Sequence, residues 1–347
     1  MTIPASIDDL SAEWLKNSTG LNIASADIQL IGVGVGVSSA VYRAKLTGAD
    51  CPASVIIKMP ALDPAAVFTS TVLRMYIREV RFYNSLAKQC PVRTPRLYYG
   101  EVDEATSQFA LVLEDIGAMR IVDQNVGMAI DDARRAIDAL AKFHATWWGK
   151  GDALAANGTT ISLGDPIYPA ILPTVFAEGW EKVNSELDVP DSIAEVAAKF
   201  APAIAGMLNS LMEGPTTLSH GDFRADNMMF TGENELALFD FQLIGTGTGA
   251  YDLAYFVTQS ISADDASKYE RELFDRWIEG LRANGVKDID RDQLWRHYRT
   301  TALFCLVYPV VASRGMDLNE PRSRALVNNM NTRFDRALRE LDLASLI

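Results

Sequence analysis

The stretch H-G-D-F-R-A-D-N, His220 to Asn227, is followed closely by L-F-D-F-Q, Leu238 to Gln242. Within them Asp222 precedes Asn227 by five residues, and Asp240 ends an apolar segment. This order is typical of phosphoryl transfer to a hydroxyl group, in which one carboxylate accepts the hydroxyl proton. An amide oxygen and a second carboxylate suit Mg²⁺, which binds few protein groups besides waters and phosphates. The sequence therefore predicts a kinase with Asp222 as the base and Asn227 and Asp240 as the metal ligands.

Three polar residues near these segments are further candidates. We expect His220 to organise the loop through hydrogen bonds rather than to transfer protons. Arg224 is interpreted either as a group that neutralises charge near Asp222 and contacts the transferred phosphate, or as half of a surface salt bridge. Asp252, in G-A-Y-D-L-A-Y-F, either caps a helix or braces the loop from behind.

Lys58 and Glu79 predict an ion pair that holds the nucleotide. Lys58 is a single lysine in the β-branched segment S-V-I-I-K-M, where it could equally guard the edge of a sheet. Glu79 lies on the apolar stripe of a predicted helix, three residues after Tyr76 and four before Tyr83. Because an unpaired carboxylate on an apolar face is costly, Glu79 needs a cationic partner. Lys58 would be the cationic partner of Glu79, and its ammonium group would reach the phosphates of the nucleotide.

Glycines 32, 34 and 36 stand between two strand-like segments in a predicted hairpin over Ile28–Leu46. The backbone N–H groups of Gly32, Gly34 and Gly36, with the hydroxyls of Ser38 and Ser39, could cover the phosphates. A plain hairpin turn fits the same pattern. The loop is neither a Walker loop, since no G-K-[ST] follows, nor a Rossmann turn, since a strand rather than a helix follows.

Composition sets broad limits. The chain has 347 residues, enough for two lobes, and a formal net charge of −13, which argues against a general nucleic-acid binder. The three cysteines, Cys51, Cys90 and Cys305, have no metal-type spacing and are expected to be reduced thiols. The first residues lack a basic region and an apolar block, and no apolar run is long enough to span a bilayer. A cytoplasmic enzyme without membrane or nucleic-acid partners is expected.

The order of elements predicts an α+β, two-lobe fold, with a β-rich lobe over residues 1–115, a mainly helical lobe over residues 116–347, and the active site between them. Besides the hairpin, strands are expected at Ser54–Met59, Arg96–Glu101, Gln108–Leu113, Met228–Phe230 and Leu236–Phe241, and a loop at Gly149–Pro169. Helices are expected at Ile7–Lys16, Thr71–Lys88, Asp131–Trp148, Thr174–Ser185, Ile193–Met212, Ala263–Asn284, Arg291–Ser313 and Pro321–Leu341.

Taken in order, these motifs resemble the aminoglycoside phosphotransferase and choline kinase superfamily, and within it the ecdysteroid kinase-like branch. The resemblance spans nearly the whole chain and also includes R-E-V-R-F-Y-N-S-L, L-V-L-E-D-I and L-A-K-F-H-A-T-W-W. It implies a protein-kinase-like fold, ATP as co-substrate and Mg²⁺. It also implies that Glu114, Asp115 and Ile116 form the hinge whose backbone meets adenine. No A-P-E segment follows Asp240, so a phosphorylated activation loop is not expected.

The acceptor stays open at this point. Amino sugars, amino alcohols, sterols and hydroxyacyl thioesters are all candidates, as are both ATP and GTP, and the oligomeric state is unknown. The segment Pro173–Asp188, expected to shape the acceptor pocket, has carboxylates that favour a cation and aromatic rings that favour an apolar ring system. A protein kinase is disfavoured by the missing activation segment. A non-catalytic nucleotide-binding protein on a kinase-like fold is the alternative hypothesis.

Overall fold

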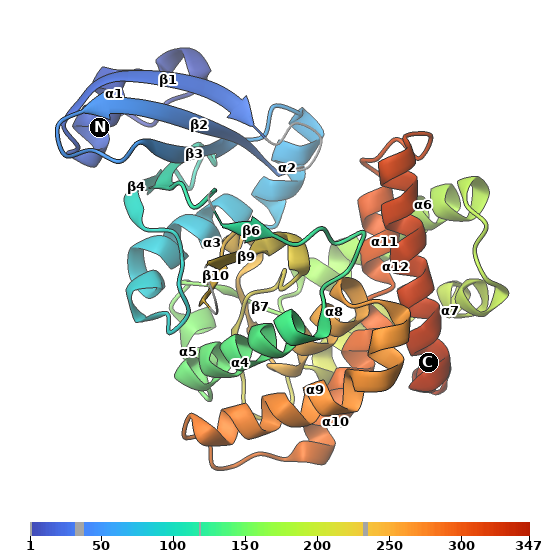
Figure 1. Ribbon diagram of the computed structural model, residues 1–347. Coiled ribbons are helices and arrows are strands. Elements are labelled where there is room, and N and C mark those ends of the chain that lie inside the picture. Colours follow the sequence, from blue (N-terminus) through green and yellow to red (C-terminus); the bar gives the residue numbers. More distant parts are fainter. Residues whose placement is uncertain (1, 32–37, 118, 232–234) are drawn as a thin grey trace. The chain divides into compact units, whose positions relative to one another are not determined.

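A computed structural model describes residues 2–31, 38–117, 119–231 and 235–347 (Figure 1). The chain forms two compact units. Unit 1 comprises residues 1–119 and 237–243, and unit 2 comprises residues 120–236 and 244–347. Unit 1 is rich in strands and unit 2 is mainly helical, which confirms the predicted α+β class.

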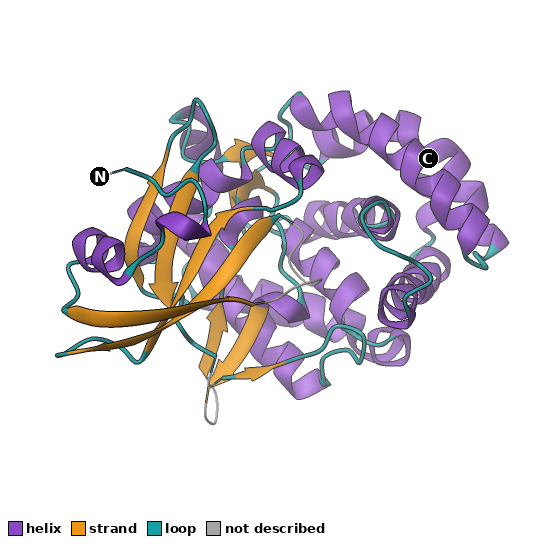
Figure 2. Ribbon diagram, turned by 90° about the horizontal axis from the view of Figure 1, so that it is seen from above, coloured by secondary structure: helices purple, strands orange, loops and turns teal. Residues whose placement is uncertain are grey.

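Unit 1 is built on a five-stranded sheet with the order β1-β2-β3-β5-β4, in which all neighbours are antiparallel. Its strands, orange in Figure 2, are β1 (Ile23–Ile31), β2 (Ser39–Gly48), β3 (Ser54–Pro60), β4 (Leu97–Val102) and β5 (Phe109–Glu114). Residues alternate between buried and accessible along β2, so Tyr42 and Ala44 join Val55 and Ile57 of β3 in one core. The predicted hairpin and the three other strands of this unit are confirmed, while residues 32–37 lie outside the described residues.

The helices of unit 1 differ from those expected. Instead of one helix over Ile7–Lys16, a 3₁₀ turn at Ile7–Asp9 precedes α1 (Ala12–Thr19), because Ser6 and Ser11 each cap a separate helical start. The expected helix over Thr71–Lys88 was also wrong in its bounds. Its region contains α2 (Pro64–Val72), α3 (Met75–Arg81), a π-helical turn at Phe82–Leu86 and a 3₁₀ turn at Ala87–Gln89.

Two local features explain this division. Asp63 accepts hydrogen bonds from the N–H groups of Ala65 and Ala66, and Pro64 takes the first helical position, where its missing N–H costs nothing. Arg74 then adopts a left-handed backbone conformation, with φ of 53°, and separates α2 from α3. The apolar stripe that predicted the helix is therefore carried by α3 and the π-helical turn.

Unit 2 contains nine helices within the part of the chain that the structure describes. They are α4 (Ile130–Trp147), α5 (Gly151–Ala156), α6 (Ile167–Glu186), α7 (Asp191–Ser210), α8 (Ala250–Ser260), α9 (Ala263–Ala283), α10 (Arg291–Phe304), α11 (Val307–Ser313) and α12 (Pro321–Glu340). The expected loop at Gly149–Pro169 is wrong, since it contains α5 and β7 (Ile161–Ser162). The helix expected over Arg291–Ser313 is two helices in the structure. Helix α10 ends before Cys305, and α11 begins after Leu306.

Short strands frame the segment with the sequence motif. β8 (Thr217–Ser219) pairs with β11 (Gly245–Gly247), which also pairs with β7. β9 (Met228–Thr231) pairs with β6 (Arg120–Ile121). β10 (Glu235–Leu238) begins in unit 2 and ends in unit 1. The motif His220–Asn227 thus lies between β8 and β9, anchored by a strand at each end.

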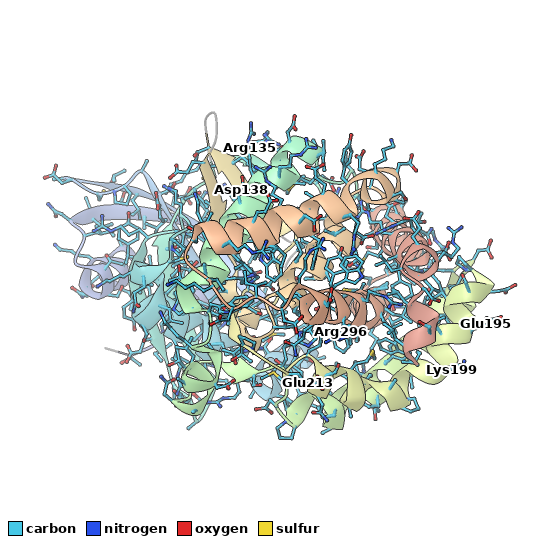
Figure 3. All side chains as sticks on the ribbon, turned by 90° about the horizontal axis from the view of Figure 1, so that it is seen from below. Arg135, Asp138, Glu195, Lys199, Glu213 and Arg296 are labelled. Atoms are coloured by element: carbon cyan, nitrogen blue, oxygen red, sulfur yellow. The ribbon has the colours of Figure 1, made fainter. Side chains whose placement is uncertain are left out.

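Helix α8 is the central helix of unit 2, since all of its residues are buried. It packs against α9, α10 and α12. Outside it, α4 and α9 lie side by side, joined by a pair between Asp138 and Arg276 at 2.6 Å (Figure 3). No helix in the described ranges is both long and apolar enough to cross a membrane.

Candidate active site

The motif loop turns sharply directly after β8. Gly221 has a φ of +79°, a left-handed conformation that favours glycine, and this turn directs Asp222 away from the line of the strand. Three residues after Asp222 a short 3₁₀ turn, Ala225–Asn227, begins and leads into β9. The N–H of Ala225 donates to the Ser260 hydroxyl at the end of α8. The loop is therefore held by backbone geometry as well as by side chains.

Asp252 braces this loop from α8. Its carboxylate accepts the backbone N–H of His220 at 2.7 Å and that of Gly221 at 2.9 Å. The same carboxylate meets Nε2 of His144 at 3.1 Å, while Nδ1 of His144 accepts the indole N–H of Trp277. Nε2 is therefore the ring nitrogen that carries the proton and donates to Asp252. Asp252 lies in the first turn of α8 and also braces the loop, so the structure shows both the position at the start of the helix and the bracing contacts.

Asp222 is 7% exposed and receives three side-chain hydrogen bonds. Its Oδ1 accepts the phenol of Tyr255 at 2.8 Å and Nε of Arg224 at 3.0 Å, and its Oδ2 accepts Nδ2 of Asn227 at 2.7 Å. Burial by itself would raise the pKa of this carboxyl group. The charge of Arg224 and the bonds from Tyr255 and Asn227 outweigh burial, so the pKa of Asp222 lies below its usual range.

Asn227 is oriented by two bonds from the same nitrogen. Its Nδ2 also donates to the backbone carbonyl of Asp222 at 2.9 Å. No described residue donates a hydrogen bond to its Oδ1. An amide oxygen left in this way is a suitable ligand for a hard cation, so the residue fits the metal role predicted for it.

Arg224 is held in a fixed position on one side of Asp222. Its Nη1 contacts Oε1 of Gln124 at 3.2 Å and Oδ2 of Asp226 at 3.0 Å. Asp226 in turn accepts the N–H of Gln124 at 3.1 Å. Burial lowers the pKa of Arg224, but the charge of Asp222 outweighs it and the pKa is raised. The simple surface salt bridge is thus excluded for this arginine, whose side chain is 25% exposed.

His220 is fully buried beneath this loop. Its Nδ1 accepts the N–H of Asp222 at 3.3 Å, and its own N–H is held by Asp252. These bonds are those of a residue that shapes the loop, as expected for it. They fix the backbone on both sides of Gly221 and hence the position from which Asp222 projects.

A second polar cluster lies within unit 1. Nζ of Lys58, on β3, is 2.7 Å from Oε1 of Glu79, on α3, and 3.0 Å from Oδ1 of Asp240. Glu79 is completely buried, and the structure contains the ion pair that the apolar stripe predicted. Burial lowers the pKa of Lys58, but the charges of Asp240 and Glu79 dominate and raise it. For Glu79, burial prevails over the attraction of Lys58 and raises the pKa.

Asp240 has an unusual backbone. Its φ is 64°, a left-handed conformation that is uncommon for a residue other than glycine and that is often found at functional sites. The next residue, Phe241, stacks on Phe82 with ring centroids 3.7 Å apart. Gln242 approaches Oδ2 of Asp240 at 3.4 Å and accepts the Ser38 hydroxyl at 2.5 Å. The direction of the Asp240 carboxylate is therefore set by neighbours on both sides of it.

The remaining predicted residues of unit 1 have distinct places. Gly32, Gly34 and Gly36 lie outside the described residues. Ser39 opens β2, and its buried hydroxyl has no partner in the described part of the chain. The hinge candidates, Glu114, Asp115 and Ile116, follow one another from the end of β5.

Both hinge carboxylates are engaged in local contacts. Glu114 is paired with Arg93 at 2.8 Å. Asp115 accepts Arg43 and Ser54, each at 2.7 Å. Burial would raise the pKa of Asp115, yet these bonds bring it below its usual range. Ile116 is buried. The side chains thus fix the segment, and its backbone is the part that would meet adenine.

The segment expected to shape the acceptor pocket belongs to α6. Its carboxylates face solvent, and one of them, Glu178, is paired with Arg314 at 2.6 Å. Phe176 is buried and stacks on Phe200 with centroids 4.5 Å apart, while Trp180 is half-buried. The positions of these side chains do not distinguish a cationic acceptor from an apolar ring system.

Sequence reasoning missed Tyr255 and Gln124. Tyr255 had a signal, because it lies three residues after Asp252 and hence on the same face of α8. Gln124 had none, since it stands 100 residues before Arg224 in an irregular segment. The bond between Gln242 and Ser38 likewise had no signal, since it spans 204 residues.

Comparison with known proteins places the chain among phosphotransferases. The sequence model of the family described as "Phosphotransferase enzyme family" matches residues 30–295 of this chain. A curated relative, an uncharacterized protein from Deinococcus radiodurans, is 35% identical over 63 residues. That match covers 18% of this chain and 18% of the relative, so it spans well under two thirds of its length.

Solved structures share the fold at low identity. Choline kinase from Cryptosporidium parvum Iowa II aligns with a TM-score of 0.58 at 11% identity, over 92% of this chain and 90% of that one. The GDP and kanamycin complex of APH(2″)-IIIa aligns with a TM-score of 0.58 at 12% identity, over 94% of this chain and 97% of that one. These likenesses establish a common two-lobe, protein-kinase-like fold.

Proposed function

The chain belongs to the phosphotransferase enzyme family, and we propose that it transfers the γ-phosphoryl group of ATP to a hydroxyl group of a small molecule. The observation that carries this proposal is the environment of Asp222. A buried carboxylate with three oriented donors stands beside an amide oxygen to which no described residue donates a hydrogen bond. The donors hold the Asp222 carboxylate in one direction, as a proton acceptor requires, and the amide oxygen is left for a cation.

Asp222 is the proposed base. Its pKa is low, so the carboxylate is ionised at neutral pH and can accept a hydrogen bond from the acceptor hydroxyl. A weak base suffices because phosphoryl transfer has a loose transition state, in which the enzyme mainly positions the nucleophile. Arg224 stabilises the charge of Asp222 and has one edge of its guanidinium left for a phosphate oxygen.

Asn227 and Asp240 are the proposed ligands of Mg²⁺. The free Oδ1 of Asn227 and the carboxylate of Asp240 are hard oxygen donors, and this small number of protein ligands is usual for Mg²⁺. When bound, the cation neutralises charge on the nucleotide phosphates. Lys58, directed by Glu79, is the proposed ammonium partner of the same phosphates.

The remaining contacts are proposed from the sequence motifs. Gly32, Gly34, Gly36, Ser38 and Ser39 would cover the phosphates, and the backbone of residues 114–116 would bind the adenine. In the structure the Ser38 hydroxyl donates to Gln242, so Ser39, with its unpaired hydroxyl, is the better donor to a phosphate. One structural neighbour is a GDP complex, so both ATP and GTP belong in any assay.

The acceptor is proposed only as a class. One neighbour is a choline kinase and another is complexed with kanamycin, and both choline and kanamycin carry hydroxyl groups and positive charge. The exposed carboxylates of α6 suit such acceptors, while its aromatic residues suit sterols and other apolar rings. Amino alcohols, amino sugars, sterols and hydroxyacyl thioesters therefore form the panel to be screened.

The test combines this screen with one variant. Release of ADP is measured with each acceptor, and binding of Mg·ATP is followed by thermal shift. Asp222→Ala should lower kcat by about 10²-fold or more while Mg·ATP binding stays within a few-fold of wild type, because the base contacts the acceptor and not the nucleotide. Undiminished turnover in this variant would refute the assignment. Binding of Mg·ATP by the wild type without turnover on any acceptor would favour the non-catalytic alternative.

A further inference from the structure

We propose that Tyr255 is a positioning residue for phosphoryl transfer, because its phenol fixes the Asp222 carboxylate so that Oδ2, and not Oδ1, meets the acceptor hydroxyl. This inference rests on the proposed function. It concerns a residue outside the motif loop, on the central helix α8, and it assigns the two oxygens of Asp222 different tasks.

Tyr255 is held in place on both sides of its ring. The residue is 3% exposed, and its hydroxyl donates to Oδ1 of Asp222 at 2.8 Å. Its ring stacks on Tyr308 with centroids 4.0 Å apart and an interplanar angle of 21°. Tyr308 is itself fixed by a hydrogen bond between its hydroxyl and that of Tyr251. A phenol held in this way can hold a carboxylate in one rotamer.

The count of donors separates the two carboxylate oxygens. Each oxygen of an ionised carboxylate offers about two acceptor positions. Oδ1 receives both Tyr255 and Arg224, so its positions are filled. Among the described residues, Oδ2 receives only Asn227 and keeps one position. The acceptor hydroxyl is therefore expected to donate to Oδ2.

The chemical state of Tyr255 supports this role. Burial, followed by the negative charge of Asp222, raises the pKa of Tyr255 well above its usual value, so the phenol keeps its proton and remains a donor.

The step itself balances. The acceptor O–H bond breaks as its proton moves to Oδ2 of Asp222, and the acceptor oxygen forms a bond to the γ-phosphorus. The bond from that phosphorus to the bridging oxygen breaks, and ADP leaves with the electron pair. Tyr255 exchanges no proton in this step. It acts only through the orientation of Asp222.

Tyr255→Phe tests the proposal, with Tyr298→Phe as the matched control. Both changes remove a buried phenol hydroxyl that donates to a carboxylate oxygen, but only Tyr255 contacts Asp222. With the acceptor that the screen identifies, Tyr255→Phe should lower kcat about ten-fold and leave KM for ATP unchanged. The control should keep the wild-type kcat.

A second measurement does not depend on turnover. Unfolding by urea is compared for the wild type, Asp222→Asn, Tyr255→Phe and the double variant. If the two side chains interact as inferred, the double variant loses less stability than the two single changes together. Additive losses, together with an unchanged kcat in Tyr255→Phe, overturn the role of Tyr255 while leaving the base assignment intact. Failure of the proposed function would appear separately, as an active Asp222→Ala.

Discussion

At the scale of single residues, the cluster of Lys58, Glu79 and Asp240 combines a structural task with a functional one. Glu79 is completely buried, and Lys58 is the cation that lies against it. Lys58→Met should lower the free energy of unfolding by about 3–5 kcal/mol, because it leaves a buried carboxylate without its charge partner. Lys45→Met, which removes an exposed lysine from β2, is the control and should change stability by less than about 0.5 kcal/mol.

The double change Lys58→Met with Glu79→Leu separates the two tasks. Apolar side chains of similar size are usually tolerated at the site of a buried ion pair. Urea unfolding should therefore show that much of the stability lost in Lys58→Met returns in the double variant. Turnover should be lost in Lys58→Met and should not return in the double variant, since no ammonium group would remain for the phosphates. A stable double variant with wild-type kcat would show that the lysine is purely structural. Equal stability of Lys58→Met and Lys45→Met would contradict the packing argument.

The same residues show what a sequence can and cannot predict. Glu79 was found because a carboxylate on an apolar stripe demands a partner, and β-branched neighbours placed Lys58 on a strand. The roles of Asp222, Asn227 and Asp240 came from their spacing. The bonds from Tyr255 and Gln124 were not found, because contacts over 33 and 102 residues depend on how helices and loops pack. Placement in the ecdysteroid kinase-like branch stays a prediction.

At the scale of elements, α8 is the support of the motif loop. Asp252 accepts two backbone N–H groups of the loop and one ring N–H of His144. Gly249 precedes the helix as its N-cap residue. A Cβ atom added to Gly249 would lie 2.8 Å from the side chain of Trp277 and 2.9 Å from that of His144. This close approach lets the His144–Asp252 pair form beneath the loop. Helix bounds were harder to predict than this, since breaks such as Arg74 arise from tertiary packing.

Asp252→Asn tests this support. An amide offers one acceptor oxygen and must direct an NH₂ group at another donor, so at least one buried N–H group loses its bond. The free energy of unfolding should fall by about 2–4 kcal/mol, and kcat should fall with it because His220 and Gly221 position Asp222. Asp138→Asn, at the exposed pair with Arg276, is the control and should cost about 1 kcal/mol or less. If both variants unfold alike, α8 does not hold the loop.

At the scale of the whole molecule, the path of the chain links the two units. Residues 237–243 belong to unit 1, although the chain reaches them only after residues 120–236 of unit 2. Within unit 1 this segment is well integrated. Leu238 donates its N–H to the carbonyl of Arg93 at 2.9 Å, Phe241 stacks on Phe82, and Asp240 pairs with Lys58. Unit 1 is therefore complete only when a later part of the chain has been made.

This path predicts how fragments behave. Residues 1–119 alone should unfold without cooperativity and bind apolar dyes, because the faces of Phe82 and Tyr83 that Phe241 covers would be exposed. Joining residues 236–244 to this fragment through a flexible linker should restore a cooperative transition in circular dichroism. The same fusion with Phe241→Ala and Asp240→Ala is the control and should stay non-cooperative, since it lacks both the ring and the charge that complete the core. A cooperative fragment 1–119 with the same midpoint as the fusion would show that the segment adds nothing to unit 1.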